Sequence, residues 1–99
     1  MIQHNAPDSL GPEAAAWWDH ITLEFCIEDA AQHLLLETAL TAFQRMLEVR
    51  EIVAKEGLQV NDFRGLRKPH PLLSTERDSR AAMLAALKAL RLDIDPGGR

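Results

Sequence analysis

Cysteine is scarce in this sequence, tyrosine is absent, and no long apolar run occurs. The single cysteine, Cys26, cannot form a disulfide within the chain, and its neighbours Phe25 and Ile27 indicate a buried thiol that packs as a small hydrophobe. Such cysteine usage is typical of a reducing, intracellular compartment. No apolar run approaches the roughly 20 residues that a membrane-spanning helix needs, and the first residues have no signal-peptide pattern. We therefore expect a cytoplasmic protein with no membrane partner.

The sequence also lacks the motifs of familiar catalytic and metal-binding sites. It contains no glycine-rich phosphate-binding loop, no CxxC pair and no nucleophile elbow. The four histidines are far apart and have no metal-ligand spacing: His4, His20, His33 and His70. His20 with Glu24, and His33 with Glu37, have i,i+4 spacing, which indicates surface pairs on helices. We expect no catalysis, no metal site and no cofactor.

The net charge of −4 argues against a dedicated nucleic-acid binder, but the charges are unevenly distributed. Residues 1–56 contain 3 basic and 10 acidic residues, whereas residues 57–99 contain 8 basic and 5 acidic ones. Any contact with phosphate should therefore come from the C-terminal part. The candidate DNA-binding residues there are Arg64, Arg67, Lys68, Arg77 and Arg80. The same side chains can instead be solvated or paired with neighbouring acids, and the sequence leaves both interpretations open.

Hydrophobic periodicity predicts a single all-α domain with three helices. Gly11-Pro12-Glu13 is typical of a helix start, so the first helix should run over about 12–25, with Trp17, Ile21 and Phe25 on one stripe. A long second helix should follow Asp29, a suitable N-cap, and end at about 56 because Gly57 favours a stop. Together with the third helix, these form a helical hairpin with a long central helix.

The stretch 58–71 interrupts the helical period, since Pro69 and Pro71 disfavour helix around them. It predicts either a small hairpin or an extended loop. Ser74 or Thr75 should then cap the third helix, whose apolar stripe is Met83, Leu87 and Leu90, with Ile94 as a further member. Outside the helical domain at 11–96 we expect a flexible arm over 1–10 and a disordered tail over 97–99.

The predicted long helix is apolar on two sides, whereas an ordinary surface helix has one apolar stripe. One side consists of Leu36, Leu40, Phe43 and Leu47. The other consists of Leu35, Ala39, Ala42, Met46, Val49 and Val53. The first and third helices can cover one side each, or one side can meet another subunit, and the two interpretations can both hold. Because so small a chain has little capacity to bury apolar surface, we expect a homo-oligomer with this second side as its candidate interface.

Three stretches together resemble the small-subunit family of phage terminases, over about Gly11 to Pro96. The first is LGPEAAAWW, which precedes and opens the aromatic first helix. The second is IEDAAQHLLLETALTAFQRMLEVREIVAKEGLQV, with an acid at its start and Gly57-Leu58 near its end. The third and closest is KPHPLLSTERDSRAAMLAALKALRLDIDP, with its proline-flanked His70 and the pair Arg77-Asp78.

The resemblance implies a non-catalytic protein for packaging viral DNA. Small terminase subunits assemble into rings, select viral double-stranded DNA and regulate the large subunit, which contains the ATPase and nuclease. This chain departs from the family in three ways. It has no basic N-terminal segment, it has Arg91 where glycine is common, and it keeps only Arg99 of a basic tail.

Two other classes remain open from the sequence. A small helical adaptor that binds a partner protein without DNA would show the same surplus of apolar surface. A small enzyme would need a site that the sequence does not show. Because the start of the second helix is acidic, with Glu28, Asp29 and Glu37, we do not expect that helix to enter DNA as a recognition helix.

Overall fold

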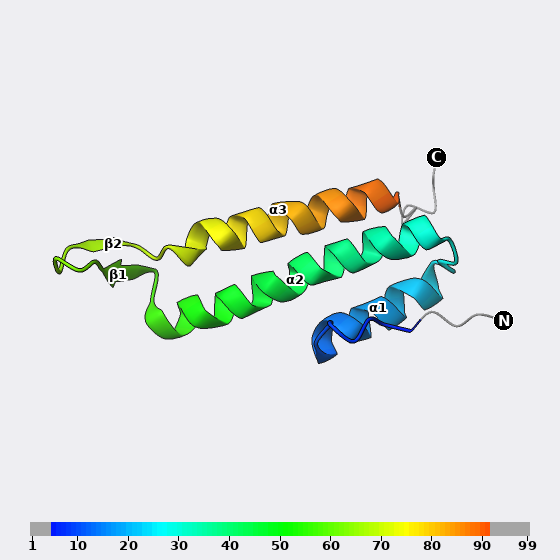
Figure 1. Ribbon diagram of the computed structural model, residues 1–99, viewed down its shortest axis with the longest axis horizontal. Helices are drawn as coiled ribbons and strands as arrows, with labels where there is room; N and C mark the ends of the chain where they lie inside the picture. The colour runs from blue at the N-terminus through cyan, green and yellow to red at the C-terminus, as the bar shows by residue number, and fades with distance from the viewer. Residues whose placement is uncertain (1–4, 92–99) are drawn as a thin grey trace.

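The computed structural model describes residues 5–91 and shows three helices joined in sequence, with a small hairpin before the last (Figure 1). The helices are α1 (Pro12–Glu24), α2 (Ala30–Glu56) and α3 (Leu72–Leu90). The strands are β1 (Gln59–Asn61) and β2 (Arg67–Pro69). The expected all-α fold with a long central helix is confirmed, and residues 58–71 form the hairpin rather than an extended loop. Ile94 and the tail at 97–99 lie outside the described residues.

The three helices lie side by side with α2 in the middle (Figure 1). The antiparallel helix α3 follows α2 along most of its length, and α1 lies along the opposite side of α2 near its N-terminal half. The Cα radius of gyration is 17.0 Å, compared with about 13 Å for a compact domain of 100 residues. The molecule is therefore elongated, and its interior is thin.

The core lies where α1, the first half of α2 and the end of α3 meet. Its buried members are Leu10, Ala14, Trp18, Ile27, Leu36, Leu40 and Leu90. The indole of Trp18 lies against the ring of His33, with ring centroids 5.5 Å apart. Consequently Trp18 faces α2, and Trp17 on the predicted stripe stays about half exposed. Among the large side chains described, Leu36 is the most completely buried, with 0% exposure.

Part of the stretch 1–10, expected to be a flexible arm, contacts the helices. Leu10 belongs to the core, and Gln44 of α2 donates a hydrogen bond from Nε2 to the Ser9 carbonyl at 3.2 Å. The same Gln44 accepts the Gly11 amide through Oε1. Ser9, Leu10 and Gly11 thus tie the end of this stretch to the helices; residues 1–4 lie outside the described residues.

The second apolar side of α2 is covered by this chain's own α3. Three residues of the candidate oligomer interface, Ala39, Met46 and Val49, are buried within the protomer. The other three, Leu35, Ala42 and Val53, are half-buried. Small residues on the facing side of α3, Ser79 and Ala86, are also buried, which lets the two helices approach closely. The first and third helices therefore cover the two sides of α2, which is the first of the two arrangements expected from the sequence.

Two predictions about local environment are wrong. Cys26 is exposed, because it follows the end of α1 with a positive φ of 52° and turns outward between Phe25 and the buried Ile27. His33 is buried instead of pairing with Glu37 on the surface. Its Nδ1 lies 3.0 Å from the Asp29 carbonyl oxygen, one turn earlier.

The cap of α3 also differs from the prediction. The helix begins at Leu72, and Ser74 and Thr75 lie inside its first turn rather than before it. The Ser74 hydroxyl donates back to the Pro71 carbonyl at 3.3 Å. Neither Asp29 before α2 nor Pro71 before α3 makes a side-chain capping bond, so α3 needs another partner for its first amides.

Replacing Leu36 by Ala should destabilise the protein by about 2–5 kcal/mol, because it removes a fully buried leucine side chain and leaves a cavity in the core. Urea unfolding followed by circular dichroism measures the change. The matched control is Leu34→Ala, two residues away on the same helix with 65% exposure, which should change the stability by less than about 0.5 kcal/mol. Equal losses in the two variants would contradict this core.

Candidate nucleic-acid interface

The hairpin of β1 and β2 extends beyond the α2–α3 pair, at the end of the molecule away from the described ends of the chain (Figure 1). The strands are antiparallel, with Gln59 opposite Pro69, Val60 opposite Lys68 and Asn61 opposite Arg67. The His70 amide continues the ladder by donating to the Leu58 carbonyl at 2.8 Å. Residues 57–71 contain three basic residues and one acid, a net charge of +2. The hairpin is therefore a basic projection on an otherwise acidic chain.

Asp62 organises the turn at the tip of the hairpin. Its Oδ1 accepts the amides of Arg64 at 2.8 Å and Leu66 at 2.9 Å, and its carbonyl accepts the Gly65 amide at 2.9 Å. Gly65 has a φ of 82°, a conformation that glycine adopts without strain. Hydrogen bonds from the Leu66 and Arg64 amides, together with the nearby charges of Arg64 and Lys68, lower the pKa of the Asp62 carboxyl. The turn is thus held by an ionised carboxylate at neutral pH.

Arg67 and Lys68 point to opposite faces of the hairpin, because successive side chains alternate along a strand. The Arg67 Nε donates to Gln59 Oε1 across the strands at 3.0 Å, which fixes its guanidinium on one face. Among residues 5–91, no carboxylate lies within ion-pair distance of Arg67 or Lys68. Both cations are exposed, so each face of the hairpin presents one positive charge to solvent.

Arg64 and Phe63 share the tip. The Arg64 guanidinium carbon lies 5.5 Å from the Phe63 ring centroid, within the range of a cation–π contact. Arg64 also lies 3.6 Å from Asp62 Oδ2, with its own side chain 65% exposed. Such an exposed pair is weak, so Arg64 remains available to an external anion.

The two candidate arginines on α3 are placed differently. Glu76 accepts Arg50 of α2 at 2.9 Å and Arg80 at 2.8 Å, and its side chain is only 15% exposed. Arg80 is therefore paired within α3, with Glu76 one turn earlier, whereas the Arg50–Glu76 pair joins α3 to α2. Arg77 lies 3.6 Å from Asp78 with both side chains well exposed, a pair that contributes little. The structure thus brings Arg64, Arg67 and Lys68 together and leaves Arg77 and Arg80 outside the hairpin.

His70 joins the hairpin to both long helices. Its Nδ1 accepts the amide of Leu72, the first residue of α3, at 3.0 Å. Nδ1 therefore has no proton, and Nε2 is the donor to Glu56 Oε1 at the end of α2, 2.6 Å away. The imidazole is buried, and the His70 carbonyl accepts the Leu73 amide at 3.1 Å. His70 thus supplies the cap of α3 that was expected from Ser74 or Thr75.

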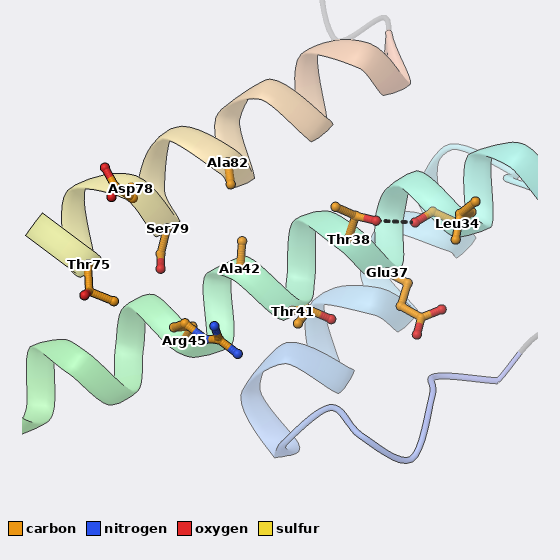
Figure 2. A pocket seen from close by; sticks show the side chains of 10 residues that line it. All are labelled: Leu34, Glu37, Thr38, Thr41, Ala42, Arg45, Thr75, Asp78, Ser79 and Ala82. Carbon is orange, nitrogen blue, oxygen red and sulfur yellow. Dashed lines mark hydrogen bonds between the residues drawn. The ribbon is translucent and has the colours of Figure 1, made fainter.

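A groove between α2 and α3 is open to solvent. It has a volume of about 530 Å³ and is lined by side chains of both helices (Figure 2). Thr38 in its wall donates to the Leu34 carbonyl at 3.0 Å, so this hydroxyl is already bonded within α2.

Within residues 5–91, no three histidine, cysteine, aspartate or glutamate side chains lie close enough together to hold a metal ion. Of the helices described, none has the length and hydrophobicity to cross a membrane.

Sequence reasoning assigned no functional role to three residues of the hairpin region: Asp62, Phe63 and His70. Arg64-Gly65 indicates a turn from the sequence, and the spacing Asp62-x-x-Gly65 could have added Asp62 to it, because aspartate and glycine at these positions favour a turn. The exposure of Phe63 had no sequence pattern that would reveal it, since an aromatic residue beside a strand is usually packed. The role of His70 depends on the meeting of α2 and α3, which are far apart in sequence.

Comparisons with known proteins give no relative: no family model, no curated protein sequence and no solved structure matches this chain.

Replacing His70 by Ala should lower the stability by about 1–3 kcal/mol, because it removes the cap of α3 and the link to Glu56 together. The specific readout is hydrogen exchange at the Leu72 amide, which should become faster than global unfolding explains. Glu56→Gln is the control, since its amide oxygen still accepts from Nε2 and its effect should be smaller. An unchanged Leu72 exchange rate in His70→Ala would show that the ring is not the cap.

Proposed function

We propose that this chain is a small terminase subunit: a non-catalytic, self-associating helical module that contacts viral double-stranded DNA and regulates a large ATPase and nuclease subunit in the host cytoplasm. The observation on which the proposal rests is the basic hairpin at the end of the α2–α3 pair. Its three cations come from the residues that the sequence assigned to DNA. The family resemblance of residues 11–96 supports the packaging role.

The shape of the hairpin suits a groove of DNA. The major groove is about 12 Å wide and admits a two-stranded ribbon, which is the form of β1 and β2. A ribbon inside a groove has a phosphate backbone on each side. Arg67 and Lys68 on opposite faces therefore each meet one backbone, and Arg64 meets a phosphate near the tip. Such contacts position the protein without reading sequence.

Three cations make a weak site, which several copies together would strengthen. Linked copies bind by avidity because the second contact becomes intramolecular. Since α3 covers the second stripe of α2, self-association would use other apolar residues. Those exposed on the helices include Trp17, Leu23 and Leu84. These side chains lie away from the hairpin, so an assembly through them leaves its cations accessible.

One observation favours the protein-binding adaptor as a second candidate. A wholly apolar groove of about 230 Å³ is lined by Trp17, Ile21, Ala39, Leu40, Phe43, Met83 and Leu87. An adaptor would use it for an apolar helix of a partner protein and would have no need of the hairpin cations. The two functions therefore differ in whether they depend on DNA and on salt concentration.

Replacing Arg64, Arg67 and Lys68 together by Ala should weaken binding to a DNA duplex at least tenfold at low salt. It should also reduce the slope of log affinity against log salt concentration by about 0.9 for each phosphate that the variant no longer neutralises. Fluorescence anisotropy over a salt series measures both. The control variant changes Arg45, Lys88 and Arg91 to Ala, which removes the same charge from exposed sites on the helical body. An unchanged slope in the hairpin variant, or equal effects in the two, would exclude the hairpin as the DNA-binding element.

Native mass spectrometry should find a closed oligomer, because head-to-tail contacts that do not close grow into filaments. Adding a DNA duplex should leave the subunit number unchanged and add the mass of the DNA. A dilution series and light scattering in solution show whether the oligomer exists before ionisation in the mass spectrometer. A strict monomer at high concentration would contradict the assembly and would favour the adaptor.

A further inference from the structure

We propose that Phe63 is a stacking platform for an unpaired base, so that the hairpin tip prefers DNA with unpaired bases to an intact duplex. The inference deepens the proposed function and rests on it, since the same cations must hold the backbone. Phe63 is the large aromatic side chain at the tip, and it takes no part in the phosphate contacts proposed for the three cations.

The exposure of Phe63 is the first observation. Its residue surface is 96% exposed, so packing within the protomer does not explain an aromatic side chain here. Two further apolar residues of the hairpin region, Leu58 and Leu66, are 67% and 56% exposed. Phe63 differs from them in offering a flat π-face at the outermost turn. A base offers a matching face whatever its identity.

The second observation is that the tip is already ordered. Asp62 receives hydrogen bonds from the amides of Arg64 and Leu66, and the Gly65 amide closes the turn onto the Asp62 carbonyl. The backbone on both sides of Phe63 is therefore fixed before any ligand arrives. A ring on a fixed backbone loses less conformational freedom on binding than one on a loose loop.

Charge identifies the ligand as a nucleic acid rather than an apolar protein surface. Arg64 lies beside the ring, with its guanidinium carbon 5.5 Å from the centroid. Arg67 and Lys68 follow within five residues on β2, unpaired by any carboxylate of residues 5–91. An apolar partner would have to desolvate these three cations without compensation. A polynucleotide supplies a phosphate for the cations and a base for the ring.

The base must be unpaired because a duplex occupies the faces of its bases. A paired base is stacked on both neighbours, and inserting a side chain between them requires that a step be unstacked. An unpaired base has no such cost. Stacking on Phe63 therefore adds affinity for single-stranded, gapped or bulged DNA that an intact duplex cannot gain.

The test measures the affinity of the full chain for three labelled probes at one salt concentration. The probes are a thymidine strand of about 12 nucleotides, an abasic strand of equal length, and a duplex of that length. Phe63→Ala should weaken binding to the thymidine strand about 30-fold, the middle of the range for one stacked base. It should leave the abasic strand within twofold, since that probe keeps the phosphates and lacks the bases. Binding to the duplex should likewise change less than twofold.

Two control variants separate stacking from general apolar contact. Phe63→Trp keeps a π-face and should retain the affinity for the thymidine strand, whereas Phe63→Leu should lose it although leucine is apolar. Leu66→Ala changes an exposed apolar residue of the same turn and should stay within twofold on every probe. Because Phe63 is almost fully exposed, its variants should remain folded, which circular dichroism verifies.

The outcomes distinguish this inference from the proposed function. Equal weakening of Phe63→Ala on the thymidine and abasic strands would overturn stacking. If the Arg64, Arg67 and Lys68 variant loses duplex binding while Phe63→Ala changes nothing, the proposed DNA contact stands and the stacking platform is wrong. If the wild-type chain binds none of the three probes, both proposals fail.

Discussion

The antiparallel packing of α3 along α2 sets the position of every other feature of this protein. It buries the second apolar side of α2, including Met46 and Val49. It also returns the chain to the end of α2, so that residues 57–71 must reverse direction within a short span. A hairpin satisfies its backbone hydrogen bonds over such a span. The projecting position of the basic residues is therefore a consequence of helix packing.

Electrostatics divides the basic residues into two groups with different uses. Glu76, whose side chain is only 15% exposed, pairs with Arg50 across the two helices, which helps to fix their packing, and with Arg80 within α3. The Asp62 carboxylate accepts two backbone amides. Its ion pair with the Arg64 side chain is long, at 3.6 Å, and Arg64 is exposed. The cations of the hairpin are thus kept available, although the chain as a whole is acidic. For the proposed DNA contact, the location of these charges matters more than the net charge of −4.

The helices could be predicted because their causes are local. The apolar period of α2, Pro12 at the start of α1 and Gly57 at the end of α2 each act over one or two turns, and the observed bounds agree with them. The environments of single residues were harder to predict. Cys26 was expected to be buried because its neighbours are apolar, yet one residue with positive φ turns its side chain outward. His33 was expected on the surface, but α1 places Trp18 over it.

Local sequence was enough to determine the three helices, the break between α2 and α3, and the presence of three cations within that break. These follow from periodicity, proline and glycine positions and charge, all of which act between near neighbours. Tertiary packing, in contrast, decided which arginines stay available, that His70 caps α3 with help from Glu56, and that Phe63 remains exposed. Each of these depends on contacts between segments that are far apart in sequence, and the packing of α3 on α2 sets those contacts.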